Sequence, residues 1–98
     1  MDYGTAYNHF SRSEQLYDIN RYEMAEKEIK LALEIEPEDT QFLGHLCRIY
    51  IATSKNSEAL PVARNALELD AGNDYLHYLM SLLQNNVGYY DKAVKSID

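Results

Sequence analysis

The chain has 98 residues, of which 46% are hydrophobic and 26% charged, and its formal net charge is −7. This length and composition fit one small globular domain or a short array of repeats with a modest core. No apolar run is long enough to span a membrane, and an acidic chain lacks the clustered Lys and Arg of a nucleic-acid surface, so we expect neither role.

The distribution of charge and the single cysteine further limit the partners, the covalent and metal sites and the compartment that we expect. Residues 6–39 carry nine acidic and four basic side chains, which favours either a solvated acidic face or a basic partner. Cys47 stands alone, so no internal disulfide and no cysteine-based metal site is expected. The first ten residues are polar and lack the apolar core of a secretory signal, although an upstream segment that has been removed would leave no trace. We expect a cytoplasmic protein.

Helical periodicity is clear over residues 24–35. Apolar side chains recur there at spacings of three and four and form one stripe: Ala25, Ile29, Ala32, Leu33 and Ile35. Pro37 ends this helix, because the residue before a proline avoids the helical region. Asp39 or Thr40 is expected to cap the next helix, residues 40–53, since both side chains can accept a hydrogen bond from a free backbone N–H. The apolar side of that helix is Leu43, Leu46, Cys47, Tyr50 and Ile51.

A further helix follows the polar stretch SKNS. Ser57 is expected to cap it, with the helix beginning near Glu58. Pro61 is then the fourth helical residue and removes only one early hydrogen bond. The helix ends near Asp70, and Gly72 is available for a left-handed turn.

The remaining residues predict one more helix pair. A helix covers residues 74–87, the sequence NNVGYY predicts a turn through Gly88, and a last helix begins near Tyr90. No segment alternates polar and apolar side chains with period two, so no strand is expected. With a first helix around Tyr7–Tyr17 that pairs with residues 24–35, the sequence therefore predicts six helices in three antiparallel pairs.

The pattern repeats at an interval of 34 residues. Ala25 and Ala59, Ala32 and Ala66, and Leu33 and Leu67 are each 34 positions apart. Helix pairs with such a period cannot bury their apolar faces alone, so they stack on one another. The 34-residue helix–turn–helix unit resembles the tetratricopeptide repeat. The resemblance implies an all-α fold, an antiparallel helix-pair solenoid that winds as a right-handed α-α superhelix. It divides the single array 1–98 into repeat 1 (6–39), repeat 2 (40–73) and a partial repeat 3 (74–98).

The resemblance rests on small residues in phase, which let helices approach closely. The family has a small residue at its eighth position and alanine at its twentieth and twenty-seventh, matched here by Ser13, Cys47, Ser81, Ala25, Ala59, Ala93, Ala32 and Ala66. Tyrosine at the seventeenth position is matched by Tyr22 and Tyr90 but not by Asn56. The closing proline is matched by Pro37 but not by Ala71.

The family's concave groove binds extended peptides or partner helices. By resemblance, the first helix of each pair would line it with Tyr7, Phe10, Glu14, Tyr17, Gln41, His45, Arg48, Ala52, Tyr75, Tyr78, Leu79 and Leu82. Aromatic side chains and Arg anchor interfaces, although several of these residues can equally pack between neighbouring helices. One subtype of the family clamps acidic chaperone tails with Lys, Asn and Arg. The matching positions here are Phe10, Glu14, His45, Tyr75 and Leu79, so that activity is not expected.

No set of residues predicts catalysis, a metal site or a cofactor. His9 and His77 occupy equivalent places two repeats apart and cannot share an ion within one molecule. Cys47 occupies the closely packed repeat position, where a buried and inert thiol is expected. The glutamates between residues 23 and 38 fit a solvated surface, and there is no glycine-rich phosphate loop.

The sequence therefore predicts a non-catalytic protein–protein interaction module. The alternative is a structural, oligomerisation or regulatory arm of a larger polypeptide whose catalytic or membrane part lies elsewhere. The chain ends within its expected sixth helix, which suggests a fragment of a longer array. Residues 74–87 are apolar around most of the helix, so self-association through residues 74–98 is a further expectation.

Overall fold

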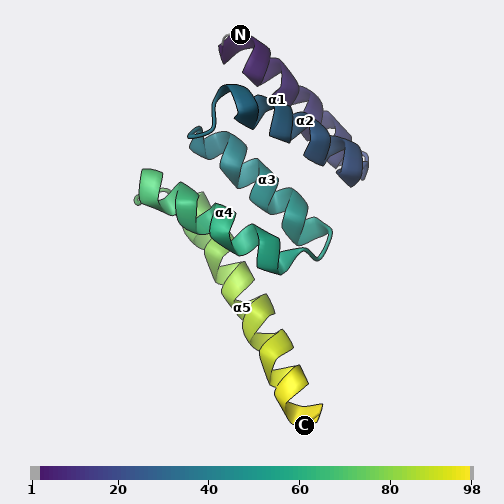
Figure 1. Cartoon of the computed structure of the whole chain (residues 1–98), viewed down its shortest axis with the longest axis vertical. Helices are drawn as coiled ribbons and strands as arrows, with labels where there is room; N and C mark the ends of the chain where they lie inside the picture. Colours follow the sequence, from purple (N-terminus) through teal and green to yellow (C-terminus); the bar gives the residue numbers. More distant parts are fainter. Residues whose placement is uncertain (1–2, 98) are drawn as a thin grey trace.

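The structure is a computed structural model that describes the backbone of residues 3–97 and the side chains of residues 3–85. Five α-helices account for nearly all of residues 3–97, and no strand occurs among them (Figure 1). Their bounds are α1 Tyr3–Asp18, α2 Tyr22–Ile35, α3 Thr40–Ala52, α4 Asn56–Leu69 and α5 Asp74–Ile97. The all-α prediction is confirmed.

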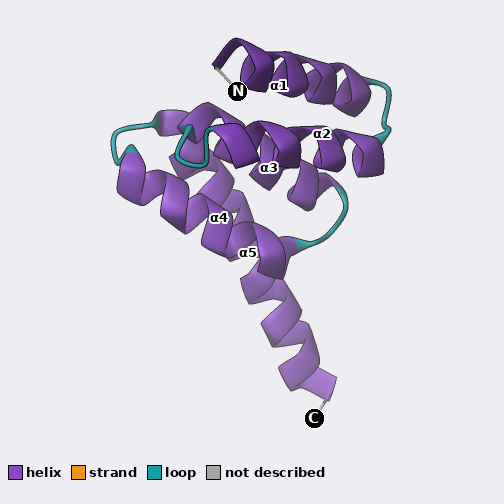
Figure 2. Ribbon diagram, turned by 45° about the horizontal axis from the view of Figure 1, so that its top comes forward, coloured by secondary structure: helices purple, strands orange, loops and turns teal. Residues whose placement is uncertain are grey.

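The helices follow one another along the long axis of an elongated molecule, whose extents are 51 × 30 × 19 Å (Figure 1). Short loops join them, so α1 packs against α2 and α3 against α4 as antiparallel pairs (Figure 2). Helix α3 lies in the middle and contacts each of the other four helices. This central position explains why its hydrophobic side chains are buried on several sides: Phe42, Leu43, Leu46, Ile49 and Tyr50.

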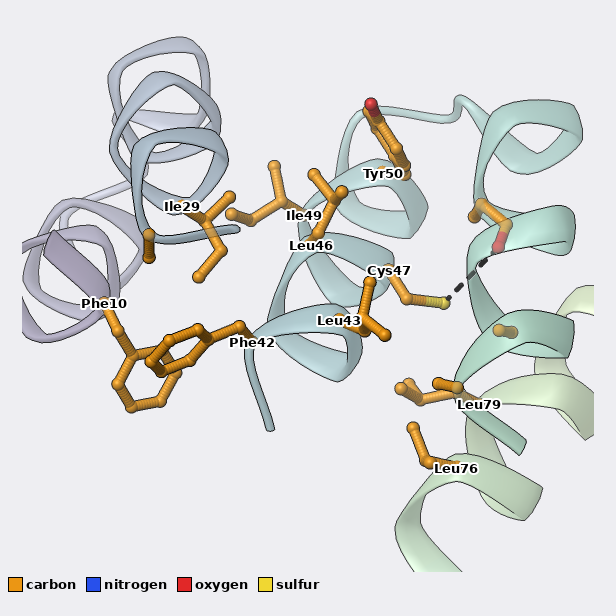
Figure 3. Close-up of a cluster of buried hydrophobic side chains, with 14 of the residues drawn as sticks. Phe10, Ile29, Phe42, Leu43, Leu46, Cys47, Ile49, Tyr50, Leu76 and Leu79 are labelled. Atoms are coloured by element: carbon orange, nitrogen blue, oxygen red, sulfur yellow. Dashed lines mark hydrogen bonds between the residues drawn. The ribbon is translucent and has the colours of Figure 1, made fainter. Parts of the chain in front are cut away.

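The core runs between the helix pairs as a continuous layer. Phe42 is the largest fully buried side chain, and it contacts the ring of Phe10 with 5.1 Å between centroids (Figure 3). Ile29 approaches from α2, and Leu76 and Leu79 approach from α5 (Figure 3). Because α3 is covered from both sides, the two helix pairs and the start of α5 share one core.

The 34-residue interval of the sequence recurs in the backbone. Helices α2 and α4 have the same length and begin 34 residues apart. The loops before them are alike. The N–H of Arg21 donates to Leu16 and that of Lys55 to Tyr50, each at 2.8 Å. The residue before each donor is left-handed, with φ of 63° at Asn20 and 62° at Ser54.

The small residues in phase lie where helices approach most closely. Ala25, Ala32, Ala59 and Ala66 are fully buried. The Ser13 hydroxyl donates to the Ala25 carbonyl at 2.6 Å. One period later, the Cys47 thiol points at the Ala59 carbonyl, with 3.9 Å between sulfur and oxygen (Figure 3). A larger side chain at either position would push the paired helices apart. Ser81, the third member, is exposed, and the side chain of Ala93 lies outside the described part.

The helix start at residue 40 follows the predicted capping. One carboxylate oxygen of Asp39 accepts hydrogen bonds from the backbone N–H groups of Gln41 and Phe42, at 3.0 and 3.1 Å. These bonds satisfy two of the donors that a helix leaves free at its first turn.

The expected cap at Ser57 is wrong. Helix α4 begins at Asn56, and Lys55 occupies the cap position without a side-chain hydrogen bond. The loop geometry sets this start, because the left-handed residue Ser54 turns the chain into the helix earlier than side-chain capping predicted. Pro61 is consequently the sixth helical residue, not the fourth, and as a residue without an N–H it cannot bond the carbonyl four positions before it.

The left-handed turn at Gly72 is also absent. No glycine among residues 3–97 has a positive φ. The turn closes instead through the N–H of Asn73, which donates to the Asp70 carbonyl at 3.2 Å. The Asn73 side chain then accepts from the Leu76 N–H at 3.1 Å and caps α5.

The turn at Gly88 and the separate helix near Tyr90 are the largest error of the prediction. Helix α5 is continuous over Asp74–Ile97, so the described residues form five helices and not six, and residues 74–97 do not form a third pair. A glycine inside a helix costs only about 1 kcal/mol relative to alanine, and no proline follows it here to stop the helix. The C-terminal part of α5 therefore extends away from the other four helices, whereas its first part packs on α3 and α4 (Figure 2).

Candidate functional site

Two adjoining hollows lie along one side of the molecule, between α1, α3 and α5. The first has a volume of about 420 Å³ and the second about 240 Å³. Arg48 and Tyr75 line both hollows and therefore form the wall between them. We call the two hollows together the groove.

The groove gathers nearly all of the residues that the sequence assigned to it. The first hollow is lined by Phe10, Glu14, Gln41, His45, Arg48 and Tyr75. The second is lined by Tyr17, Arg48, Ala52, Tyr75, Tyr78, Leu79 and Leu82. Tyr7 lines neither hollow. It is half-exposed beside Phe10, with 5.6 Å between ring centroids.

The prediction from sequence left out some of the residues that line the groove. Gly44 and Ile51 also line the groove, and they lie 34 residues after Phe10 and Tyr17. Prediction had placed His45 and Ala52 one residue further along instead, so strict addition of the repeat length was the signal that would have found them. Thr40, Asn73 and Leu76 complete the first hollow from the ends and the floor.

Gly44 lines the first hollow at a point where a side chain would press against α5. A Cβ at this position would lie 3.3 Å from a terminal carbon of Leu76 and 3.8 Å from the Tyr75 ring. Helix α5 can therefore lie close to α3 at this point, which brings Tyr75 to the wall between the hollows.

Arg48 is held from two sides at the centre of the groove. One of its terminal nitrogens, Nη2, lies 2.7 Å from Nδ1 of His45. Its guanidinium lies over the ring of Tyr17, with 4.3 Å between the central carbon and the ring centroid. The nearest carboxylate oxygen, on Glu14, is 3.9 Å from Nη2, beyond hydrogen-bond distance. Arg48 Nε is buried without a hydrogen-bond partner in the described structure.

A chain of hydrogen bonds fixes the protonation of His45. The Ser13 hydroxyl donates its proton to the Ala25 carbonyl, so its oxygen accepts from Nε2 of His45 at 2.9 Å. Nδ1 then has no proton and accepts from Arg48. Burial, together with the charge of Arg48, lowers the pKa of His45 to about 4. His45 is therefore a neutral part of the floor.

The other side chains that could act as acids, nucleophiles or metal ligands are engaged in structural contacts. His9 pairs with Glu28 across α1 and α2, at 2.6 Å, and His77 bonds the Ala71 carbonyl at 2.7 Å. Burial raises the pKa of the Cys47 thiol to about 11, which leaves it protonated and unreactive. Within the described residues, no three His, Cys, Asp or Glu side chains come together as ligands for a metal ion.

The acidic exterior of α2 is partly neutralised by neighbouring cations. Glu26 accepts from Lys30 at 2.8 Å and lies 3.3 Å from Lys55 of the next loop. Although burial acts to raise the pKa of Glu26, the bonds from the two lysines outweigh it and the pKa lies below its ordinary value. This surface behaves as a solvated face with ion pairs, each stabilising the fold only modestly.

The comparisons with known proteins add no assignment. No model of a known protein family matches the chain, and no curated protein resembles it significantly. None of the helices in the described part combines the length and the apolar character needed to cross a bilayer.

Proposed function

We propose that this chain is a non-catalytic protein–protein interaction module, a tetratricopeptide-type array that holds a segment of a partner protein in the groove. The supporting observation is that groove positions recur at the repeat interval. Phe10, Gly44 and Tyr78 form one such series, and Glu14, Arg48 and Leu82 form another. Stacked helix pairs present equivalent positions along one continuous surface, which suits a linear ligand that spans several repeats.

The chemistry of the groove supports the same proposal. Tyr75 and Tyr78 are 45% and 58% exposed, and aromatic side chains with one Arg among them are the groups that anchor protein interfaces. The His45 and Cys47 side chains are held in a neutral or protonated form that suits a scaffold better than an acid–base centre.

A selection of random displayed peptides of about 12 residues tests this function. We expect enriched peptides to bind the folded chain and to shift the amide resonances of α1, α3 and α5 that border the groove. Tyr78→Lys should weaken binding, whereas Met24→Lys should not, because Met24 is similarly exposed at 51% but lies outside the groove. Failure to enrich any peptide that binds there would reject the proposal.

A further inference from the structure

We infer that the groove recognises an extended segment carrying one acidic side chain, whose carboxylate pairs with Arg48, beside an apolar side chain that enters the second hollow. This inference rests on the proposed function and names the chemistry of its ligand. It begins from Arg48, which among the residues lining the two hollows is the one permanent cation.

The guanidinium of Arg48 is already oriented before any ligand arrives. His45 accepts one of its protons from below, and the ring of Tyr17 covers one face. A long side chain normally loses much rotamer freedom when it binds, and an arginine held in place has lost part of it already. Arg48 therefore places a fixed positive charge between the two hollows.

The same guanidinium lacks a good anionic partner. Glu14 approaches only to 3.9 Å, and its own side chain is 45% exposed. Nε is buried and has no acceptor among the described residues, so a ligand would meet the exposed part of the guanidinium. An arginine that can form two parallel bonds to a carboxylate instead has two neutral partners, His45 and Tyr75, and a longer ion pair with Glu14. A ligand carboxylate would complete this set while Glu14 moves into solvent.

Charge also limits how acidic the ligand can be. The chain carries a net charge of −7, and Glu14 itself lines the first hollow. A run of acidic residues would be repelled by this field, whereas one carboxylate placed against Arg48 gains a close partner. The fit is therefore a single Asp or Glu among uncharged residues, not an acidic tail.

The lining favours an extended segment over a helix. The first hollow offers the side chains of Thr40 and Gln41, for which the structure gives no hydrogen bond within its described part. An extended segment has free backbone N–H and C=O groups for such partners, whereas a helix uses its own internally. The second hollow is apolar beyond Arg48, with Ile51, Leu79 and Leu82 in its wall. Alternate side chains of an extended segment point the same way, so one can meet Arg48 and another this wall.

The peptide selection supplies the test. Enriched groove-binding peptides should share an Asp or Glu next to apolar residues. In a synthetic copy of one such peptide, Glu→Gln should weaken binding by about tenfold, measured by titration of fluorescence anisotropy. Arg48→Gln should abolish the preference for Glu over Gln, and Arg48→Lys should restore only part of it, because Lys lacks the paired geometry.

Glu14→Gln gives a result of the opposite sign. Removing the competing carboxylate should strengthen binding of the Glu peptide about threefold or more, and leave the Gln peptide nearly unchanged. This variant leaves the bonds of Arg48 to His45 intact, so it tests the inference even if Arg48 variants are unstable. If groove-binding peptides show no acidic residue, or if Glu and Gln peptides bind equally, the inference fails while the proposed function stands. If no selected peptide contacts the groove, the function itself fails.

Discussion

The two helix pairs, α1–α2 and α3–α4, solve the same packing problem with different chemistry. Ser13 in the first pair and Cys47 in the second are both fully buried and both point at a carbonyl of the paired helix. The serine bond is 2.6 Å long and continues through His45 to Arg48, whereas the cysteine contact is 3.9 Å long and ends there. The backbone tolerates either residue because both are small.

This difference separates what the repeat needs from what the groove needs. The 34-residue interval constrains side-chain size at the helix contacts, so alanine recurs there. The groove positions recur in place but not in kind, since Glu14, Arg48 and Leu82 are an anion, a cation and an apolar side chain. Variants at the two kinds of position should therefore affect different properties of the chain.

We expect the largest loss of stability at the buried alanines, which both helix pairs have in equivalent places. Ala59→Leu should overpack the contact with α3 and lower the free energy of unfolding by as much as about 3 kcal/mol. Ala25→Leu should have a similar effect, because both alanines are fully buried. Ala52→Leu is the control, since Ala52 is an exposed helix position. Denaturant unfolding of the three variants measures this, and an undisturbed Ala59→Leu would mean that the helices are not in close contact there.

A pH dependence should arise where the two pairs meet, at His45 of α3, which is bonded to Ser13 of α1. The pKa of His45 falls from an ordinary 6.5 to about 4 on folding, so the unfolded state binds more protons between these values. The stabilisation is fully present above the unfolded pKa and is lost as the pH falls toward the folded one. We expect a loss of about 2 kcal/mol between roughly pH 7 and pH 5.

The matched variant for this prediction is His45→Gln, which cannot titrate and is similar in reach. Its unfolding free energy should vary less over the same pH interval than that of the wild type. Equal pH dependence of the two proteins would contradict the neutral, hydrogen-bonded state of His45.

Much of the fold was predictable because helix contacts leave a periodic trace in the sequence. The alanines in phase, Pro37 and the Asp39 cap located α2, α3 and α4. Positions governed by loop backbone were not predictable, since Ser57 looked like a cap but the left-handed Ser54 sets the helix start. Gly88 misled for a related reason: glycine permits a turn without requiring one.

The candidate groove was predictable in membership but not in mechanism. A repeat with known spacing identifies which positions share a surface, so most of the lining residues were found. The link from Ser13 through His45 to Arg48 joins three residues that no motif connects. It depends on side-chain directions across two helices, which a single sequence does not specify.

Removing the Ser13 hydroxyl should lower the stability of the fold more than removing the Cys47 thiol. Ser13→Ala leaves the buried N–H of His45 without an acceptor, whereas the Ala25 carbonyl keeps its bond within α2, and an unpaired buried group costs about 1–3 kcal/mol. Cys47→Ala removes only a weak contact and some volume, so we expect about 1 kcal/mol or less. Thermal melts of both variants decide the order. If Cys47→Ala is the more destabilising, the volume at the helix contact matters more than the hydrogen-bond chain.

The smallest effect is expected in self-association, which stays a prediction for helix α5. Tyr75 and Tyr78 expose apolar surface on this helix, and Leu82 lines the same side of the groove. We expect the molar mass from light scattering to rise with protein concentration, through contact between copies at this surface. Leu82→Glu should reduce the rise and Met24→Glu should not.

Leu83 is unsuitable for this test because it is fully buried, so a charge there would unfold the chain rather than block an interface. A constant monomer mass at high concentration would show that the exposed tyrosines are not sufficient to bring two copies together, and would leave the groove to a partner of a different sequence.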